Sequence, residues 1–231
     1  MLLRSFLALT TLVAIAGCAV SQSGSAMRSA SELANASATS TGLPASGPVE
    51  PGTYHVAPSA WSEAGYTITL PRGWETQYGH TFIKHSDAPG ELGFYFVIVD
   101  AIFSDPCLGE GELIEVGQSV DDLVDALLEQ PVVLASEPEE TTLGGLPAKR
   151  IDFSVPDDLD AAACRMGEHL QIWYSPPADK YFVLLGDGTA SGYVLDVDGQ
   201  RQVFLTQYRA GATPEDVAEM ETIVESIEID S

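Results

Sequence analysis

The histidine and aspartate side chains of residues 80–87 are the first place where this sequence could bind a metal. His80 and His85 are five residues apart, and Asp87 follows closely. On an extended strand, side chains five residues apart point to opposite faces, so the two imidazoles would not converge on one ion. The cysteine and histidine spacing typical of zinc sites is absent as well. We therefore interpret both histidines as ordinary surface residues and predict no metal site.

Two acidic segments hold carboxylates close enough in sequence to suggest cation binding. Asp196 and Asp198 are two residues apart and would share one face of a strand. The further ligands of a calcium loop, including its bidentate glutamate, do not follow. Asp198-Gly199 is instead a strong signal for a two-residue hairpin turn. Asp157-Asp-Leu-Asp160 is a denser acidic group, which we interpret as a solvated loop, with weak cation binding as the alternative.

The motifs of nucleophilic and nucleotide-dependent enzymes are missing from this sequence. Gly188-Thr-Ala-Ser-Gly192 places a serine among glycines, but its spacing differs from that of a nucleophile elbow. Paired-histidine protease, phosphate-loop and dinucleotide motifs do not occur either. We predict no catalytic residue, no cofactor and no enzyme activity. A triad assembled from distant residues is the alternative that the sequence leaves open.

Aromatic side chains are the remaining candidates for ligand contact. They could line an apolar cleft between a sheet and a helix, although strand aromatics more often pack in a core. We expect Trp74, which follows Pro-Arg-Gly, to close the first turn of the sheet. Trp61 precedes the first strong strand signal and is the best candidate for an exposed contact. The full set is Trp61, Trp74, Trp173, Tyr174, Tyr181, Tyr193 and Tyr208.

Residues 1–17 have the parts of a bacterial export signal. One arginine, Arg4, precedes an uncharged apolar stretch from Phe6 to Ala16. As a helix this stretch would be about 17 Å long, too short for a bilayer core of about 30 Å. Such a length is typical of a signal peptide. The following Ile15-Ala-Gly-Cys18 resembles the lipobox of bacterial lipoproteins.

The lipobox resemblance implies that Cys18 receives a diacylglyceryl group and becomes the first residue of the mature chain. Two acyl chains anchor a protein stably, whereas one chain anchors it only marginally. We therefore expect a lipid-anchored protein on the extracytoplasmic face of a cell membrane. The alternative is an ordinary signal peptide with a chance cysteine.

Acylation of Cys18 would leave an even pair of cysteines, Cys107 and Cys164, in an oxidising compartment. This arrangement predicts one disulfide, with two buried thiols as the alternative. Residues 18–53 are predicted to be the lipidated cysteine and a flexible tether, because the segment is rich in Ser, Ala, Gly and Thr. Residues 54–231 are predicted to form a single globular domain.

The charge of the chain limits its partners. Thirty-four acidic and ten basic residues give a formal net charge of −24 at pH 7. The field of such a surface repels phosphate backbones, so nucleic-acid binding is excluded. The same charge favours solubility and does not by itself indicate a cationic ligand.

Strand signals dominate the domain, and two helices are predicted among them. Ser119 begins the first helix through a capping box, and Pro131 ends it. Thr213 begins the second, with Pro214 in its first turn and Val217, Met220, Val224 and Ile227 facing inward and Ile223 at the margin. Strands are predicted at 66–70, 81–85, 94–103, 132–134, 148–155, 170–174, 181–185, 193–197 and 202–208.

Several of these segments, in this order, resemble actinobacterial secreted and lipid-anchored proteins with a PsbP-like domain, of which the LpqN-type lipoproteins are members. The resemblance implies an α+β fold, in which a twisted, mainly antiparallel sheet is flanked by helices in an α/β/α sandwich. It implies no catalytic residues, because fold does not determine function. The matching stretches are Tyr66–Trp74, Asp105–Cys107, Ser119–Leu128, Gly145–Arg150, Val194–Arg201 and Ile223–Ile227.

Together these observations predict a membrane-tethered, non-enzymatic binding or accessory domain of the cell envelope. We expect it to recognise another protein, because a compact acidic domain on a flexible tether shows no motif for chemistry. The alternative is a lipoprotein that holds a small glycan or lipid precursor in a cleft between sheet and helix.

Overall fold

The computed structural model describes residues 42–108, 112–167, 169–175 and 180–230, all within one compact unit. Cys18, the predicted signal peptide and most of the predicted tether lie outside these residues. No helix in the described ranges is long and apolar enough to cross a membrane.

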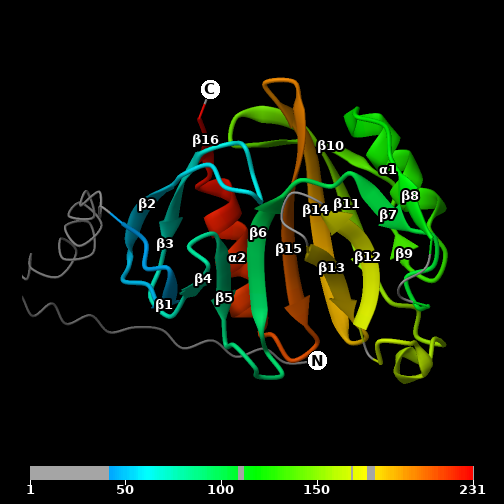
Figure 1. Ribbon diagram of the computed structural model, residues 1–231. Helices are drawn as coiled ribbons and strands as arrows, with labels where there is room; N and C mark the ends of the chain where they lie inside the picture. Colours follow the sequence, from blue (N-terminus) through cyan, green and yellow to red (C-terminus); the bar gives the residue numbers. More distant parts are fainter. Residues whose placement is uncertain (1–41, 109–111, 168, 176–179, 231) are drawn as a thin grey trace, which may run out of the picture. The chain divides into compact units, whose positions relative to one another are not determined.

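A large antiparallel sheet organises the domain (Figure 1). Its nine strands in the described residues all pair antiparallel with their neighbours. From edge to edge they are β1 (Ser46–Pro48), β4 (Glu75–Gln77), β5 (Thr81–Lys84), β6 (Leu92–Val97), β15 (Gln200–Arg209), β14 (Gly188–Val197), β11 (Leu146–Ser154) and β10 (Glu139–Leu143), with β9 (Leu134–Ala135) also paired to β11.

Two smaller antiparallel sheets complete the strand content of the described residues. One has the order β13 (Lys180–Leu185), β12 (His169–Ser175), β7 (Ala101–Phe103) and β8 (Leu113–Glu115). The other has the order β16 (Glu228–Ile229), β3 (Tyr66–Leu70) and β2 (Gly52–Val56). A short 3₁₀ helix, Ala161–Ala163, precedes Cys164.

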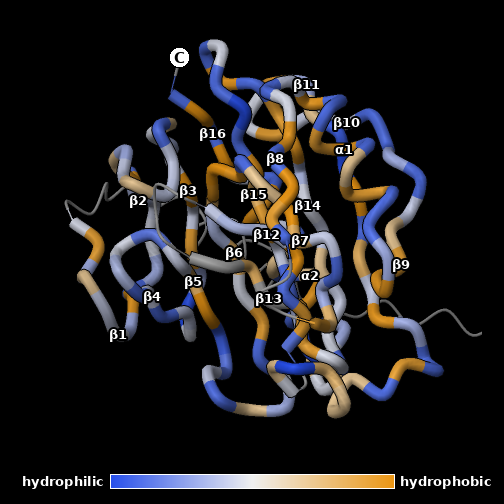
Figure 2. Tube along the Cα trace, turned by 45° about the vertical axis from the view of Figure 1, so that its right-hand side comes forward, coloured by the Kyte–Doolittle hydropathy of each residue, from blue (hydrophilic) through white to orange (hydrophobic). Residues whose placement is uncertain are grey.

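The two helices pack on opposite faces of the large sheet, in separate apolar cores. Helix α1 (Val120–Glu129) buries Leu123 and Leu127 with the four-stranded sheet, while α2 (Pro214–Glu225) buries Ile223 with the three-stranded sheet. Figure 2 shows the apolar segments concentrated between these layers. The fold is therefore α+β, with a mainly antiparallel sheet flanked by helices, as the sequence predicts.

Local signals in the sequence placed both helix starts and the main hairpin correctly. Ser119 caps α1 through the predicted capping box, and Thr213 accepts the backbone N–H of Asp216 at the start of α2. Strands β14 and β15 meet at Asp198 and Gly199, whose φ angles of 54° and 85° suit a two-residue turn. The Asp196 carboxylate accepts the Gly199 N–H at 2.9 Å, so it serves the turn.

The domain begins earlier than the predicted boundary at residue 54. Strand β1 pairs with β4, and β2 starts at Gly52. Val49 is buried, and its N–H donates to the Trp74 carbonyl at 2.8 Å. The prediction failed because backbone pairing brings residues 46–53 into the sheets although their side chains show no apolar period.

The predicted central strand at 94–103 is two strands in different sheets. Strand β6 ends at Val97 and β7 begins at Ala101, and the exposed Asp100 lies between them. The chain leaves the large sheet here and crosses to the four-stranded sheet. The apolar run is continuous because both strands are buried, and apolar composition reports burial without reporting a change of direction.

Smaller corrections concern individual side chains. The strand predicted at 132–134 is reduced to β9, because Val132 has a φ angle of 74°, which is incompatible with a strand. In α2, Ile223 is fully buried while Val217 is only half-buried, the reverse of the predicted order. Strand β5 pairs with β4 and β6 in the large sheet, whereas β3 pairs with β2 and β16 in the small one.

Candidate binding surface

The predicted disulfide is present. It joins Cys107, which follows β7, to Cys164, which lies in the segment before β12. The sulfurs of Cys107 and Cys164 are bonded at 2.06 Å. The Asp105 carboxylate accepts the backbone N–H groups of Cys107 and Leu108 at 2.9 and 3.1 Å. The Arg165 N–H donates to the Cys107 carbonyl at 2.9 Å. These contacts hold the chain on both sides of the disulfide in one fixed conformation.

Strand β8 is the edge of this sheet and carries exposed apolar side chains. Ile114 pairs with Ile102 of β7, and in the described residues no strand lies beyond β8. Leu113 and Ile114 are 40% and 47% exposed. An exposed apolar edge strand is a surface that another chain can pair with, and most proteins avoid it.

Further exposed apolar side chains lie around this strand. In the described residues, six of the seven exposed large apolar side chains fall between residues 108 and 166. We call four of them the apolar edge: Leu108, Leu113, Ile114 and Met166. The disulfide and the Arg165–Cys107 hydrogen bond place the chain at Leu108 beside the chain at Met166. The apolar edge therefore consists of two pairs of exposed apolar side chains, one on β8 and one beside the disulfide.

A buried glutamine fixes α1 to the same sheet. The Gln130 side-chain amide donates to the carbonyls of Phe103 in β7 and Ile172 in β12, at 2.9 and 2.7 Å. Phe103 is the register partner of Leu113. The end of α1 is therefore linked to the strand beside β8, and Figure 1 shows α1 and β8 on the same side of the domain.

A row of aromatic rings at the β4–β5 turn forms a second feature, in which Tyr78 is exposed and the other rings are half-buried. Tyr78 is 71% exposed and has a φ angle of 57°, in the left-handed region. Its ring stacks on His80 with centroids 6.1 Å apart, and Trp61 lies 4.8 Å beyond His80. Trp61 also meets Tyr95 edge-on at 5.8 Å. Burial lowers the pKa of His80, which favours a neutral ring in this array.

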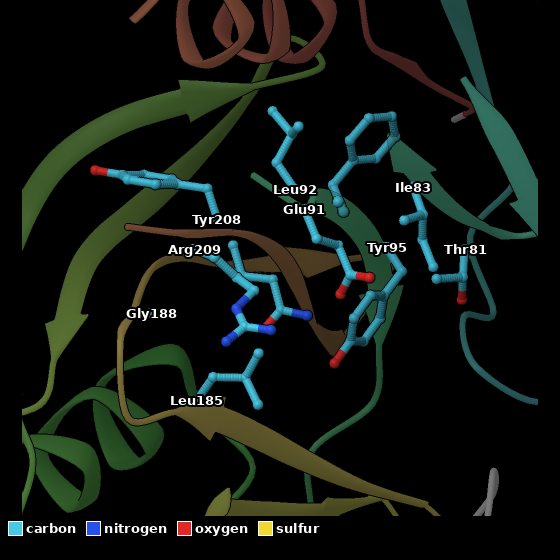
Figure 3. Close-up of a pocket in the computed structure, with 12 residues that line it drawn as sticks. Thr81, Ile83, Glu91, Leu92, Tyr95, Leu185, Gly188, Tyr208 and Arg209 are labelled. Carbon is cyan, nitrogen blue, oxygen red and sulfur yellow. The ribbon is translucent and has the colours of Figure 1, made fainter. Parts of the chain in front are cut away.

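Beneath the array is a small cavity between the large sheet and the end of β13 (Figure 3). Tyr95, Leu185 and Arg209 point toward it, and Gly93 and Gly188 also line it. Burial raises the pKa of Tyr95, so its hydroxyl stays protonated. A volume of about 40 Å³ holds roughly three water molecules. It is too small for a sugar ring or an acyl chain.

A larger recess lies between α2 and strands β10, β11 and β14. Its volume is about 510 Å³, within the range of small-ligand sites. Arg150 stands in its wall, held by the Asp152 carboxylate at 2.9 Å and the Ser191 hydroxyl at 3.3 Å. The Arg150 guanidinium lies 5.8 Å from the centre of the Tyr193 ring. A neighbouring recess of about 130 Å³ shares Arg150 and Tyr193 and extends to Tyr208.

The aromatic residues singled out from the sequence separate into three environments. Trp173 is fully buried against Phe182 and lines none of the recesses described above. Trp74 is buried too, and its indole N–H donates to Glu219 at 2.9 Å. Tyr193 lines both recesses beside α2, Tyr208 lines only the smaller one, and Trp61 is half-buried against His80. The side chain of Tyr181 lies outside the described residues.

The polar candidates are likewise dispersed. His80 contacts aromatic rings, whereas His85 lies 3.3 Å from Asp216 at the start of α2. Asp157 and Asp158 are exposed. Among the described residues, no three His, Cys, Asp or Glu side chains are grouped to hold a metal. Sequence reasoning did not find the apolar edge or Tyr78, because exposure at a sheet edge and a left-handed turn leave no residue pattern.

Comparison with known proteins finds only distant structural likenesses. No protein-family model matches this chain, and no curated protein sequence does. Among solved structures, cyanobacterial PsbP (CyanoP) of Synechocystis sp. PCC 6803 is similar at 11% identity and a TM-score of 0.34, over 82% of this chain and 95% of that one. A protein of Bacteroides thetaiotaomicron is similar at 11% identity and a TM-score of 0.35, over 79% of this chain.

The match spans only half of the Bacteroides protein. At these identities and TM-scores the likenesses carry no argument about family or function. The architecture and the exposed surfaces therefore define this chain as an α+β domain with a candidate docking edge and a polar recess. Its structural similarity to a PsbP-like protein assigns neither a family nor a lineage.

Proposed function

We propose that this protein is a lipid-anchored, non-enzymatic domain on the extracytoplasmic face of the cell membrane, where it binds another protein of the envelope. The observation that carries the proposal is the apolar edge. Leu113 and Ile114 are exposed on a terminal strand, and the segments beside it are joined by the disulfide and by the Gln130 hydrogen bonds. Exposed apolar side chains on an ordered edge strand are typical of interfaces, because little backbone has to be ordered on binding.

The small cavity and the dispersed polar groups support binding over catalysis. The cavity of about 40 Å³ is too small for an ordinary substrate, and the larger recess beside α2 is a candidate binding site. His85 contacts the Asp216 carboxylate and His80 contacts the Thr81 hydroxyl, but no described contact brings a carboxylate and a nucleophile to the same imidazole. The lipobox resemblance at Cys18 supports the membrane location that we propose. The resemblance to LpqN-type lipoproteins supports our proposal that the chain belongs to the secreted and lipid-anchored proteins with a PsbP-like domain.

Site-specific crosslinking in living cells tests the proposal. A photo-crosslinking amino acid at Ile114 should capture one defined envelope protein, and the same amino acid at the exposed Gln200 hairpin should not. Leu113→Asp should abolish the capture by placing a charge in the interface. Identical products from both positions, or a product that survives Leu113→Asp, would show that the apolar edge binds no partner.

The anchor is tested separately with Cys18→Ser. We expect this variant to lose acylation and to leave the membrane fraction. Retention of the intact variant in the membrane would contradict lipid anchoring while leaving the binding proposal open to the crosslinking test.

The recess beside α2 favours a second candidate function, the binding of a small glycan. Its lining contains Thr141, Thr142, Arg150 and Glu221, which suit hydroxyl groups better than an acyl chain. A glycan is therefore favoured over the lipid precursor. Titration of the protein with soluble N-acetylglucosamine oligomers tests this, with Arg150→Met as the variant expected to lose binding. Equal heats of binding for the wild type and for Arg150→Met would contradict glycan binding in this recess.

A further inference from the structure

The hydrogen bonds of β8 show which of its backbone groups are already used. The Ser104 N–H donates to the Glu112 carbonyl at 3.0 Å, and the Val116 N–H donates to the Asp100 carbonyl at 2.9 Å. Hydrogen-bonded positions alternate along an antiparallel strand. Residues 112, 114 and 116 therefore face β7, and the N–H and C=O groups of Leu113 and Glu115 point away from the sheet.

The side chains on the same strand alternate between the two faces of the sheet. Ile114 lies on one face, and Leu113 and Glu115 lie on the other. Glu112 and Glu115 are both exposed, so each end of the strand carries a negative charge. The apolar centre and the acidic ends together describe what an added strand must match.

We propose that β8 binds an extended segment of the partner protein as a fifth strand of the four-stranded sheet. The segment pairs antiparallel through the outward groups of Leu113 and Glu115, which is the geometry of strand addition. It carries apolar side chains at its centre and lysine or arginine near Glu112 and Glu115. This inference rests on the proposed protein-binding function and names the chemistry of the partner.

Charge argues for a basic partner and against a second copy of this chain. Each copy has a formal charge of −24. If two β8 strands paired about Ile114, Leu113 of each would face Glu115 of the other, and an apolar side chain would oppose a carboxylate twice. A lysine opposite Glu115 instead forms a cross-strand ion pair of the favourable sign.

Two substitutions of Glu115 separate the backbone from the charge. Glu115→Pro removes an outward N–H and leaves the bonds to β7 intact, because proline is tolerated where the N–H faces solvent. Glu115→Ala removes the carboxylate and keeps the N–H. Unchanged thermal unfolding of both variants shows that β8 is still formed.

The probe is a labelled Thr-Lys-Val-Val-Lys-Thr peptide, titrated into the full-length protein in detergent micelles. Paired antiparallel, it places its lysines opposite Glu115 and Glu112 and its valines opposite Ile114 and Leu113. We expect saturable binding, weakened about tenfold by Glu115→Pro and about threefold by Glu115→Ala. Bound peptide should slow hydrogen exchange at the Leu113 and Glu115 amides. A peptide with glutamate in place of lysine should not bind.

Several results would overturn the inference. Charge alone attracts the peptide if Glu115→Pro leaves its affinity unchanged. The same conclusion follows if bound peptide does not slow hydrogen exchange at the Leu113 and Glu115 amides. Self-association in sedimentation that Glu115→Pro abolishes would assign the edge to a second copy. If the Ile114 crosslink persists in Glu115→Pro, the proposed function stands and strand addition fails.

Discussion

Lys84 joins β5 to the start of α2, and its replacement by methionine tests how the C-terminal helix is held. The Lys84 ammonium lies 2.6 Å from an Asp216 oxygen and 2.8 Å from a Glu219 oxygen. Only 13% of its side chain is exposed, against 15% for Asp216. Glu219 also accepts the Trp74 indole N–H. Lys84→Met keeps the apolar stem and leaves two carboxylates side by side without their cation.

The expected cost follows from the contacts and from the titration of Asp216. Removing one member of a buried ion pair costs about 3–5 kcal/mol, and partial exposure of Glu219 reduces this. Independently, the hydrogen bond from Lys84, aided by that from Thr213, lowers the pKa of Asp216 from 3.8 to about 2. A shift of this size corresponds to about 2 kcal/mol. We expect Lys84→Met to lose about 2 kcal/mol of unfolding free energy near pH 6.

The same coupling predicts a definite dependence on pH. Asp216 has a lower pKa in the folded protein than in the unfolded chain. Its contribution is therefore complete above about pH 4 and is lost as the pH falls through about 2. In urea unfolding, the difference between wild type and Lys84→Met should shrink over this range.

Lys149 provides a matched control. Its ammonium also lies 2.6 Å from a carboxylate, but that of Asp121 is 70% exposed. Lys149→Met should therefore resemble wild type at every pH, because solvent screens an exposed pair. Equal losses for the two variants, or a Lys84→Met loss that is constant from pH 6 to pH 2, would refute the reasoning.

Three further predictions concern the turn, the buried arginine and the disulfide. Tyr78→Asn should raise the unfolding free energy by about 1 kcal/mol in thermal denaturation, because asparagine tolerates the left-handed conformation; a lower stability would contradict this strain. Arg201→Leu should cost about 3 kcal/mol in urea, since the guanidinium donates to the carbonyls of Val99, Gly117 and Ser119; an unchanged midpoint would contradict it. Cys164→Ala should cost about 4 kcal/mol, and peptide mapping of the unreduced wild type must find Cys107 linked to Cys164.

Predictions from local signals succeeded wherever the signal acts within a few residues. Ser119 begins α1 because its hydroxyl accepts the Asp122 N–H at 3.1 Å, a bond contained in one turn of chain. Asp198-Gly199 closes its hairpin for the same reason. The pairing of Cys107 with Cys164 was predictable from the even number of remaining cysteines and from the expected oxidising compartment.

Predictions failed where distant segments decide the outcome. The apolar run from Phe94 to Phe103 is divided between two sheets, and no residue pattern in the run predicts this division. Trp173 could have lined a cleft, but Phe153 and Phe182 fill the space around it. The recess beside α2 exists because Arg150 and Tyr193, 43 positions apart, lie on neighbouring strands.

The sequence by itself determined the helix starts, the hairpin, the disulfide pair and the acidic charge, because each depends on neighbouring residues or on composition. It also contains Ile15-Ala-Gly-Cys18, which resembles a lipobox and supports our proposal of a lipid anchor. Only the tertiary structure decided that Leu113 and Ile114 lie on an uncovered edge, since strand order depends on pairings between segments far apart in the chain. That edge, rather than any motif, carries our proposal of a protein partner.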